Sequence, residues 1–114
     1  MTQNVEAAVV SALRSAGIEA SADVPADRPG RFCTVELTGR STLARGAIQT
    51  HAVAVQSWAP TRYEASELAA EAEAAVLGMD EPWLMSVEPD TLYYFASEDG
   101  LPRYQATYEL TVCP

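Results

Sequence analysis

Residues able to catalyse a reaction or to bind a metal are few in this chain and do not cluster along the sequence. His51 is the only histidine, and Cys33 and Cys113 lie far apart and form no CxxC pair. Zinc sites bring several histidine or cysteine ligands together, and no HxH or HExxH pattern accompanies His51. We therefore predict that His51 is a structural or surface residue and that the chain binds no metal.

Motifs for nucleotides, cofactors or nucleophilic catalysis are missing from the sequence. It contains no Walker loop, no GxGxxG and no GxSxG motif. The acidic pairs Asp80-Glu81 and Glu98-Asp99 fall in segments with turn composition, where such residues are common. Carboxylate catalysis needs a pair held in a cleft with separated pKa values, which this spacing does not predict. We expect a protein that is not an enzyme and uses no cofactor.

Aromatic residues cluster toward the end of the chain, at residues 93–95 and at Tyr104 and Tyr108. A stacking platform for single-stranded nucleic acid also needs a basic groove. The chain has 16 acidic and 7 basic residues, with a net charge of −9, and this charge opposes contact with phosphates. We interpret the aromatic residues as core and cross-strand packing.

Length and composition predict one folded domain over residues 1–114, since 48% of the residues are hydrophobic. The first 17 residues lack a basic n-region and space their apolar residues helically, so we expect no signal peptide. No run of apolar residues reaches membrane-spanning length. We expect reduced cysteines, and whether their strands bring them together stays open.

The first half of the chain reads as a helix followed by two strands. Helical spacing begins after Asn4, a candidate N-cap, and ends at Gly17. Residues 18–31 read as a loop, with room for a short edge strand at 18–24. Residues 32–38 alternate as a half-buried strand that ends at Gly39, with Cys33, Val35 and Leu37 on the apolar side and Thr34, Glu36 and Thr38 on the other. Residues 40–46 read as a polar loop, and residues 48–58 read as a long central strand.

A second helix starts with the capping box Thr61-x-x-Glu64 and ends near Leu77, before Gly78. We place its apolar side at Tyr63, Leu68, Ala72, Ala75 and Val76, and a solvated acidic face at Glu64, Glu67, Glu71 and Glu73.

Strands are then expected at 85–88, 91–97 and 103–112, with a turn at 98–100. In the last strand Tyr104, Ala106, Tyr108, Leu110 and Val112 share one side. The order predicts an α+β two-layer sandwich, with a mainly antiparallel sheet of about four to five strands and two helices on one face. We expect the other face to be solvated or to meet another subunit.

Four segments in this order resemble the tail terminator proteins of long-tailed, siphovirus-type phages, particularly those of actinobacteriophages, which cap the tail tube. After an amphipathic helix, Arg31-Phe32 opens a strand containing VELTG, and the long strand ends in QSWA. The Ala-rich helix includes EASELA, and the last strand is PRYQATYEL, residues 102–110. The likeness covers nearly the whole chain.

The resemblance implies a virion protein without a catalytic site, assembled in the host cytoplasm into a ring of six. This ring would cap the tail tube protein, stop polymerisation, and meet the head–tail connector or stopper protein. DNA would pass through the lumen without specific binding, and no membrane would be involved. An acidic lumen, consistent with the charge of −9 per copy, would repel DNA from its walls.

Candidate contacts with a neighbouring subunit or with the tube follow from this ring. They are Arg31, Arg40, Arg45, Arg103, Tyr104, Glu64, Glu67 and Glu71. Arg103 either pairs with a carboxylate of a neighbour's helix at 64–73 or caps an edge within its own subunit, and Arg31 invites the same two interpretations. Residues 39–47 either reach the tube or a neighbour or form a flexible hairpin loop.

Other functions fit the sequence too. Another neck ring protein, such as a head-completion, stopper or adaptor protein, is the nearest alternative. A small cytosolic ligand-binding or enzymatic α+β domain is an alternative of a different class, and it predicts an apolar pocket with convergent polar groups.

Overall fold

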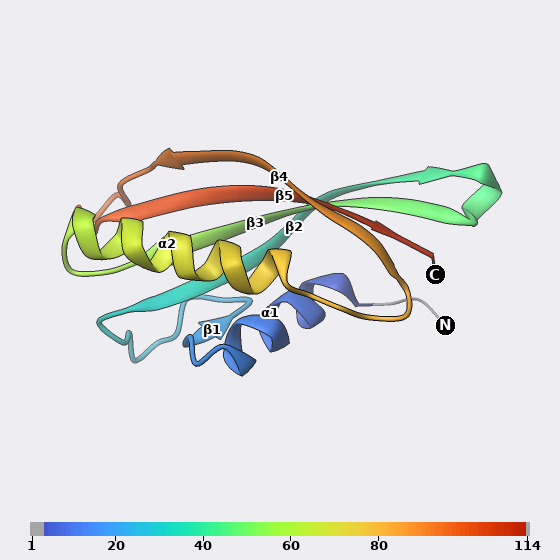
Figure 1. The fold of residues 1–114 in the computed structure, drawn as a ribbon. Coiled ribbons are helices and arrows are strands. Elements are labelled where there is room, and N and C mark those ends of the chain that lie inside the picture. The colour runs from blue at the N-terminus through green and yellow to red at the C-terminus, as the bar shows by residue number, and fades with distance from the viewer. Residues whose placement is uncertain (1–3, 114) are drawn as a thin grey trace.

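A computed structural model describes residues 4–113 of the chain (Figure 1). Its elements are α1 (Val5–Ser15), β1 (Ala20–Ser21), β2 (Phe32–Leu43), the 3-10 turn η1 (Ala44–Gly46), β3 (Ile48–Trp58), α2 (Arg62–Leu77), β4 (Leu84–Tyr94) and β5 (Arg103–Val112).

The five strands form one sheet in the order β1-β2-β3-β5-β4. β1 and β2 run parallel, and the other three neighbouring pairs are antiparallel. Both helices cover the same face of the sheet (Figure 1), with α1 against β2 and α2 across β3, β5 and β4. This arrangement confirms the predicted α+β sandwich, and β3 takes the predicted central place.

The hydrophobic core lies between the helices and this face of the sheet. β5 alternates as predicted, because Ala106, Tyr108, Leu110 and Val112 are all buried. The apolar residues that meet them come from both helices and from β2 and β3, and include Val9, Leu13, Val35, Val53, Val55, Leu68, Ala72 and Val76.

Both predicted helix N-caps are present. The Asn4 side chain accepts a hydrogen bond from the Ala7 amide at 2.9 Å, and the Thr61 hydroxyl accepts one from the Glu64 amide at 3.1 Å. Each bond satisfies an amide that the helix itself leaves without a partner. Gly17, with φ of +84°, then ends the turn after α1 in a left-handed conformation.

The predicted strand end at Gly39 is wrong. β2 continues to Leu43, and the loop predicted at 40–46 shrinks to η1. Gly39 lies at a shift of register, since Leu37 pairs with Val53 and Gly39 with Ala52. A bulge accommodates the glycine, and β3 supplies ladder partners on both sides of it.

The two strands predicted at 85–88 and 91–97 are a single strand, β4. Pro89 lies between them, and the register against β5 shifts at this point. β4 is the edge strand of the sheet formed by residues 4–113, and an edge strand tolerates the missing amide of a proline.

Three side chains take a different environment from the predicted one. Leu37 is 39% exposed although it was placed on the buried side of β2, while Thr34 is only 5% exposed. Leu37 falls in the exposed part of β2, which follows its first four residues, whereas Thr34 is hydrogen-bonded to the Gln56 and Trp58 side chains. Tyr63 is 71% exposed, because it lies about 200° around the helix from Ala65, where the buried stripe begins.

Candidate assembly surfaces

The outer part of the β2–β3 hairpin projects away from the helices (Figure 1). The first four residues of β2 are buried and the last eight are exposed. We call residues 37–48 the distal hairpin. It contains Arg40 and Arg45 and no acidic residue, and neither arginine forms a salt bridge with an acid among residues 4–113.

The distal hairpin exposes apolar side chains and has a strained tip. Leu37 and Leu43 are 39% and 57% exposed. Ala44, Arg45 and Gly46 have φ of +50°, +57° and +92°, and this left-handed region costs a residue with a side chain about 1 kcal/mol or more. A two-stranded hairpin is only marginally stable by itself, and this one projects away from the helices (Figure 1).

The face of the sheet opposite the helices carries a row of polar side chains across four strands. The Thr34 hydroxyl donates to Gln56 Oε1 at 2.7 Å, Gln56 Nε2 donates to Gln105 Oε1 at 2.9 Å, and Gln105 Nε2 donates to the Tyr93 hydroxyl oxygen at 2.6 Å. Trp58 Nε1 also donates to the Thr34 hydroxyl oxygen at 3.2 Å. This row ties β2, β3, β5 and β4 together.

Arg103 lies in an aromatic row beside it. Phe32 stacks on Trp58 with ring centroids 5.5 Å apart. The Arg103 guanidinium carbon lies 4.6 Å from the Trp58 centroid and 4.2 Å from that of Phe95, and Arg103 Nε donates to the Phe95 carbonyl at 2.8 Å. These contacts hold the Arg103 side chain against rings of its own subunit.

The loop before β2 closes over this aromatic row. Arg28 lies 5.6 Å from the Trp58 centroid and forms a 2.8 Å ion pair with Asp99 of the β4–β5 turn. Hydrogen bonds from Ser97 and Arg28 lower the pKa of Asp99 to about 2. Because Arg28 and Arg103 lie over its ring, Trp58 is only 4% exposed, although it lies on the face without helices.

Tyr104 is half-buried on the helix side of β5. Its hydroxyl oxygen accepts a bond from Arg62 Nε at 3.3 Å, and its ring meets that of Tyr94 edge-to-face at 5.3 Å. Arg62 also lies 4.4 Å from the Tyr94 centroid. Tyr104 thus links the start of α2 to β4.

The acidic face of α2 is engaged at one point. Arg31 forms an ion pair with Glu71, so its charge is matched within the chain. Glu64 and Glu67 are exposed and form no salt bridge within residues 4–113. Of the candidate contact residues, Arg40, Arg45, Arg103, Glu64 and Glu67 therefore form no salt bridge within residues 4–113. Arg103 is held instead by the rings of Trp58 and Phe95.

The edge strand β4 is exposed along most of its length. Met85 and Leu92 are 56% and 55% exposed. Glu88 pairs directly opposite Glu109 of β5, and like charges in such a position destabilise a sheet. Asp90 lies nearby, within 3.4 Å of the Thr107 hydroxyl. We call Glu88, Asp90 and Glu109 the β4 acidic patch.

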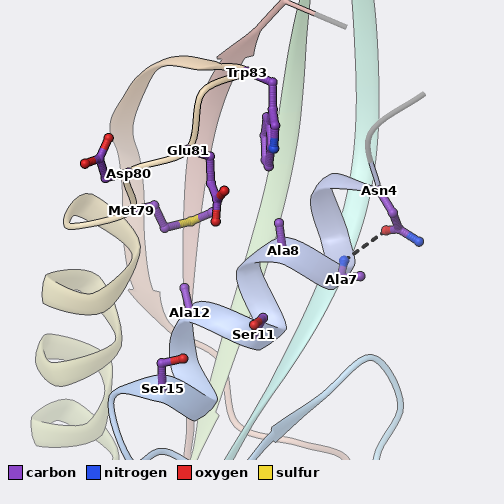
Figure 2. Close-up of a pocket in the computed structure, with 10 residues that line it drawn as sticks. All are labelled: Asn4, Ala7, Ala8, Ser11, Ala12, Ser15, Met79, Asp80, Glu81 and Trp83. Atoms are coloured by element: carbon purple, nitrogen blue, oxygen red, sulfur yellow. Dashed lines mark hydrogen bonds between the residues drawn. The ribbon is translucent and has the colours of Figure 1, made fainter. Parts of the chain in front are cut away.

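A hollow lies between α1 and the segment that leads into β4 (Figure 2). It measures about 450 Å³, and small α1 residues such as Ala8, Ala12 and Ser15 line one side of it. Met79 and Trp83 line the other side, together with the acids Asp80 and Glu81. Among residues 4–113, no cationic side chain lines it.

His51 and the cysteines form no reactive cluster. His51 is 3% exposed, and its Nε2 lies 3.1 Å from Gln49 Oε1. Burial, and then the charge of Arg40, lower its pKa. Cys33 is buried and free, Cys113 is exposed and free, and burial raises the pKa of Cys33 to about 11.

Within residues 4–113, no group of three or more His, Cys, Asp or Glu side chains is arranged to hold a metal ion. No helix in this range is long and apolar enough to cross a membrane.

Comparison with known proteins finds a structural relative. No family model and no curated protein matches the sequence. Among solved structures, the fold matches a chain of the "Virion of native gene transfer agent (GTA) particle", with a TM-score of 0.77. The two chains share one fold. The match covers 96% of this chain and 95% of that chain at 17% sequence identity, so the likeness is one of fold over nearly the full length of both.

Two surface features lay beyond the sequence interpretation. The polar row joins Thr34, Gln56, Gln105 and Tyr93, which are far apart in the chain and become neighbours only through strand pairing. The opposition of Glu88 and Glu109 depends on the register of β4 against β5. The one signal available beforehand was the alternation of polar residues along the last strand.

Proposed function

We propose that this chain is a structural protein of a phage-like virion, and that it acts as a tail terminator. A ring of copies caps the tail tube, stops its polymerisation and provides the surface that meets the head–tail connector. DNA passes through the lumen of this ring without specific binding.

One observation carries the proposal: a fold shared with a virion-particle chain bears a projecting hairpin with exposed leucines and unmatched arginines. The exposed side chains of this segment add little to the core of a single subunit, whereas in an assembly they can form a contact with another chain. The exposed edge of β4, with its apolar side chains, supports the same role.

Imaging of the protein with purified tail tubes of the same virion tests the proposal, with the protein alone and the tubes alone as controls. We expect ring-shaped density at one end of each tube and tubes that no longer lengthen when tube subunits are added. Bare tubes that keep growing would contradict the terminator role.

Another neck ring protein is the second candidate, because the fold match names a virion particle and no layer within it. Pull-down against the tube protein and against the connector protein separates the two. Binding to the connector alone would favour a stopper, head-completion or adaptor protein.

A ligand-binding α+β domain would place its ligand in the hollow between α1 and Trp83 (Figure 2). It predicts a monomer or dimer whose thermal midpoint rises with a small apolar ligand. A midpoint that does not change with ligand concentration, together with ring formation, would favour the assembly role.

A further inference from the structure

Two edges of the sheet lack strand partners within residues 4–113, and they lie on different sides of the molecule. β1 pairs only with Cys33 and Thr34 of β2, so the outer edge of the distal hairpin is bare, apart from the Leu37 amide that donates to Glu6. β4 is the opposite edge. Both edges present backbone groups to which a further strand can bond.

The two edges carry opposite charge. The distal hairpin holds Arg40 and Arg45 and no acid, whereas β4 holds Glu88 and Asp90 and no base. Glu109 adds a third carboxylate beside β4, directly opposite Glu88. A cationic strand laid along β4 would relieve this repulsion.

Apolar side chains accompany the charges on both edges. Leu37 and Leu43 are exposed on the hairpin, and Met85 and Leu92 are exposed on β4. Pro89 and the two acids of β4 hinder pairing with an arbitrary strand. The two acids also favour a strand that brings positive charge.

From these observations we propose that the distal hairpin of one copy docks along β4 of a second copy. The outer edge of β2 pairs with the free edge of β4, and Arg40 and Arg45 face the β4 acidic patch. This inference rests on the proposed ring, and it names the contact between neighbouring subunits.

The contact joins two different surfaces, so each copy donates a hairpin on one side and accepts one on the other. Head-to-tail contacts of this kind form a closed ring when the rotation between copies closes. The strained tip at Ala44 and Arg45 lies at the end of the segment that docks along β4 of the neighbour.

Paired charge reversals test the contact. One variant carries Arg40→Glu and Arg45→Glu, and a second carries Glu88→Arg and Asp90→Arg. We expect each variant alone to need at least about tenfold more protein for ring formation, because like charges then face each other across the contact. An equimolar mixture should recover ring formation, since the two variants are complementary when they alternate around a ring.

The control variant carries Glu19→Arg and Asp27→Arg, two exposed positions outside both edges, with the same change of charge as the second variant. It should assemble like the unmodified protein. Circular dichroism and thermal midpoints verify that every variant is folded. Mass measurement follows rings in solution, and imaging follows rings on tail tubes.

The results distinguish failure of the proposed ring from failure of the proposed contact between subunits. If the unmodified protein forms no ring alone or on tubes, the proposed function fails and the contact with it. If rings form but neither reversal weakens them, or the mixture does not recover, the contact is wrong and the ring role stands. If the hairpin variant forms rings in solution that no longer bind tubes, the hairpin docks on the tube protein instead, which also overturns the contact.

Discussion

Thr34 shows how one hydroxyl supports a whole face of the sheet. It donates to Gln56 and accepts from Trp58, and it is 5% exposed. These bonds connect the polar row to the aromatic row that holds Arg103. A buried polar atom that loses its partner pays the cost of desolvation without compensation.

We expect Thr34→Val to lower the free energy of unfolding by about 1–3 kcal/mol, because Gln56 Oε1 and Trp58 Nε1 each lose a partner. The matched control is Thr42→Val on the exposed part of β2, expected to change it by less than about 0.5 kcal/mol. Urea unfolding at pH 7 measures both. Equal losses in the two variants would contradict the importance of the row.

His51 makes the stability of the fold depend on pH. Its pKa in the folded chain lies below the ordinary 6.5, mainly because it is buried. As the pH falls below 6.5, the unfolded chain takes up a proton at His51 while the folded chain does not, so stability falls. Well above pH 6.5, His51 is neutral in both the folded and the unfolded chain, so its titration no longer changes the free energy of unfolding.

Replacement of His51 by Gln removes this titration. The difference in unfolding free energy between the two proteins should change between pH 7.5 and pH 5.5, with the unmodified protein losing more stability on acidification. A constant difference over this range would show that His51 titrates alike in the folded and unfolded chain.

The two thiols differ in reactivity. Cys113 is exposed, whereas Cys33 is buried with a pKa raised to about 11, and only a thiolate reacts readily with disulfide reagents. At pH 8 we expect one fast reacting thiol per folded chain and two in urea. Cys113→Ser should abolish the fast reaction, and persistence of it would show that Cys33 is accessible.

At the scale of elements, α2 is held by its buried stripe. Its buried residues are Ala65, Leu68, Ala69, Ala72 and Val76, and they pack against β3, β5 and β4. Leu68 is fully buried, while Leu77 at the end of the helix is 42% exposed. The small alanines let the helix lie close to the sheet, so Leu68 supplies much of the contact.

Leu68→Ala should therefore cost about 2–5 kcal/mol of unfolding free energy, through lost burial and the cavity left behind. Leu77→Ala makes the same chemical change at an exposed site and should cost less than about 1 kcal/mol. Thermal and urea unfolding compare them. Similar costs would mean that α2 packs less tightly on the sheet than its burial indicates.

The distal hairpin is an element with a different purpose, since its side chains contribute little to the core. The buried residues of β2 are its first four. The residues of β2 that stabilise the core and the residues proposed to mediate assembly are thus different parts of one strand.

At the scale of the whole molecule, this separation predicts a folded protein that does not assemble. Replacing residues 43–48 by Asn-Gly joins Thr42 and Gln49, which are partners in the ladder, through a two-residue turn. We expect the thermal midpoint to shift by only a few degrees, within about 1 kcal/mol, while ring formation is lost. A shortened protein that still caps tail tubes would remove the hairpin from the assembly surface.

Charge at this scale agrees with the proposed ring. The chain carries a net charge of −9, yet the hairpin is free of acids. An acidic protein with one basic arm attracts copies of itself in one orientation and repels them in others.

Much of the fold follows from local signals in the sequence. The spans of α1, α2, β3 and β5 agree with prediction, because caps, helix-ending glycines and the period of apolar residues act over a few positions. The α+β class then follows from the order of these elements.

The tertiary structure alone decided the rest, because it depends on residues distant in the chain. Gly39 and Pro89 read as strand ends, but β3 and β5 supply ladder partners that carry β2 and β4 past them. In the sequence, Arg31 and Arg103 are candidates equal to Arg40 and Arg45. In the structure, Glu71 pairs with Arg31, and Arg103 lies against the rings of Trp58 and Phe95. The type of a residue determines its charge, but only the fold determines whether a side chain that can pair with this charge already lies beside it.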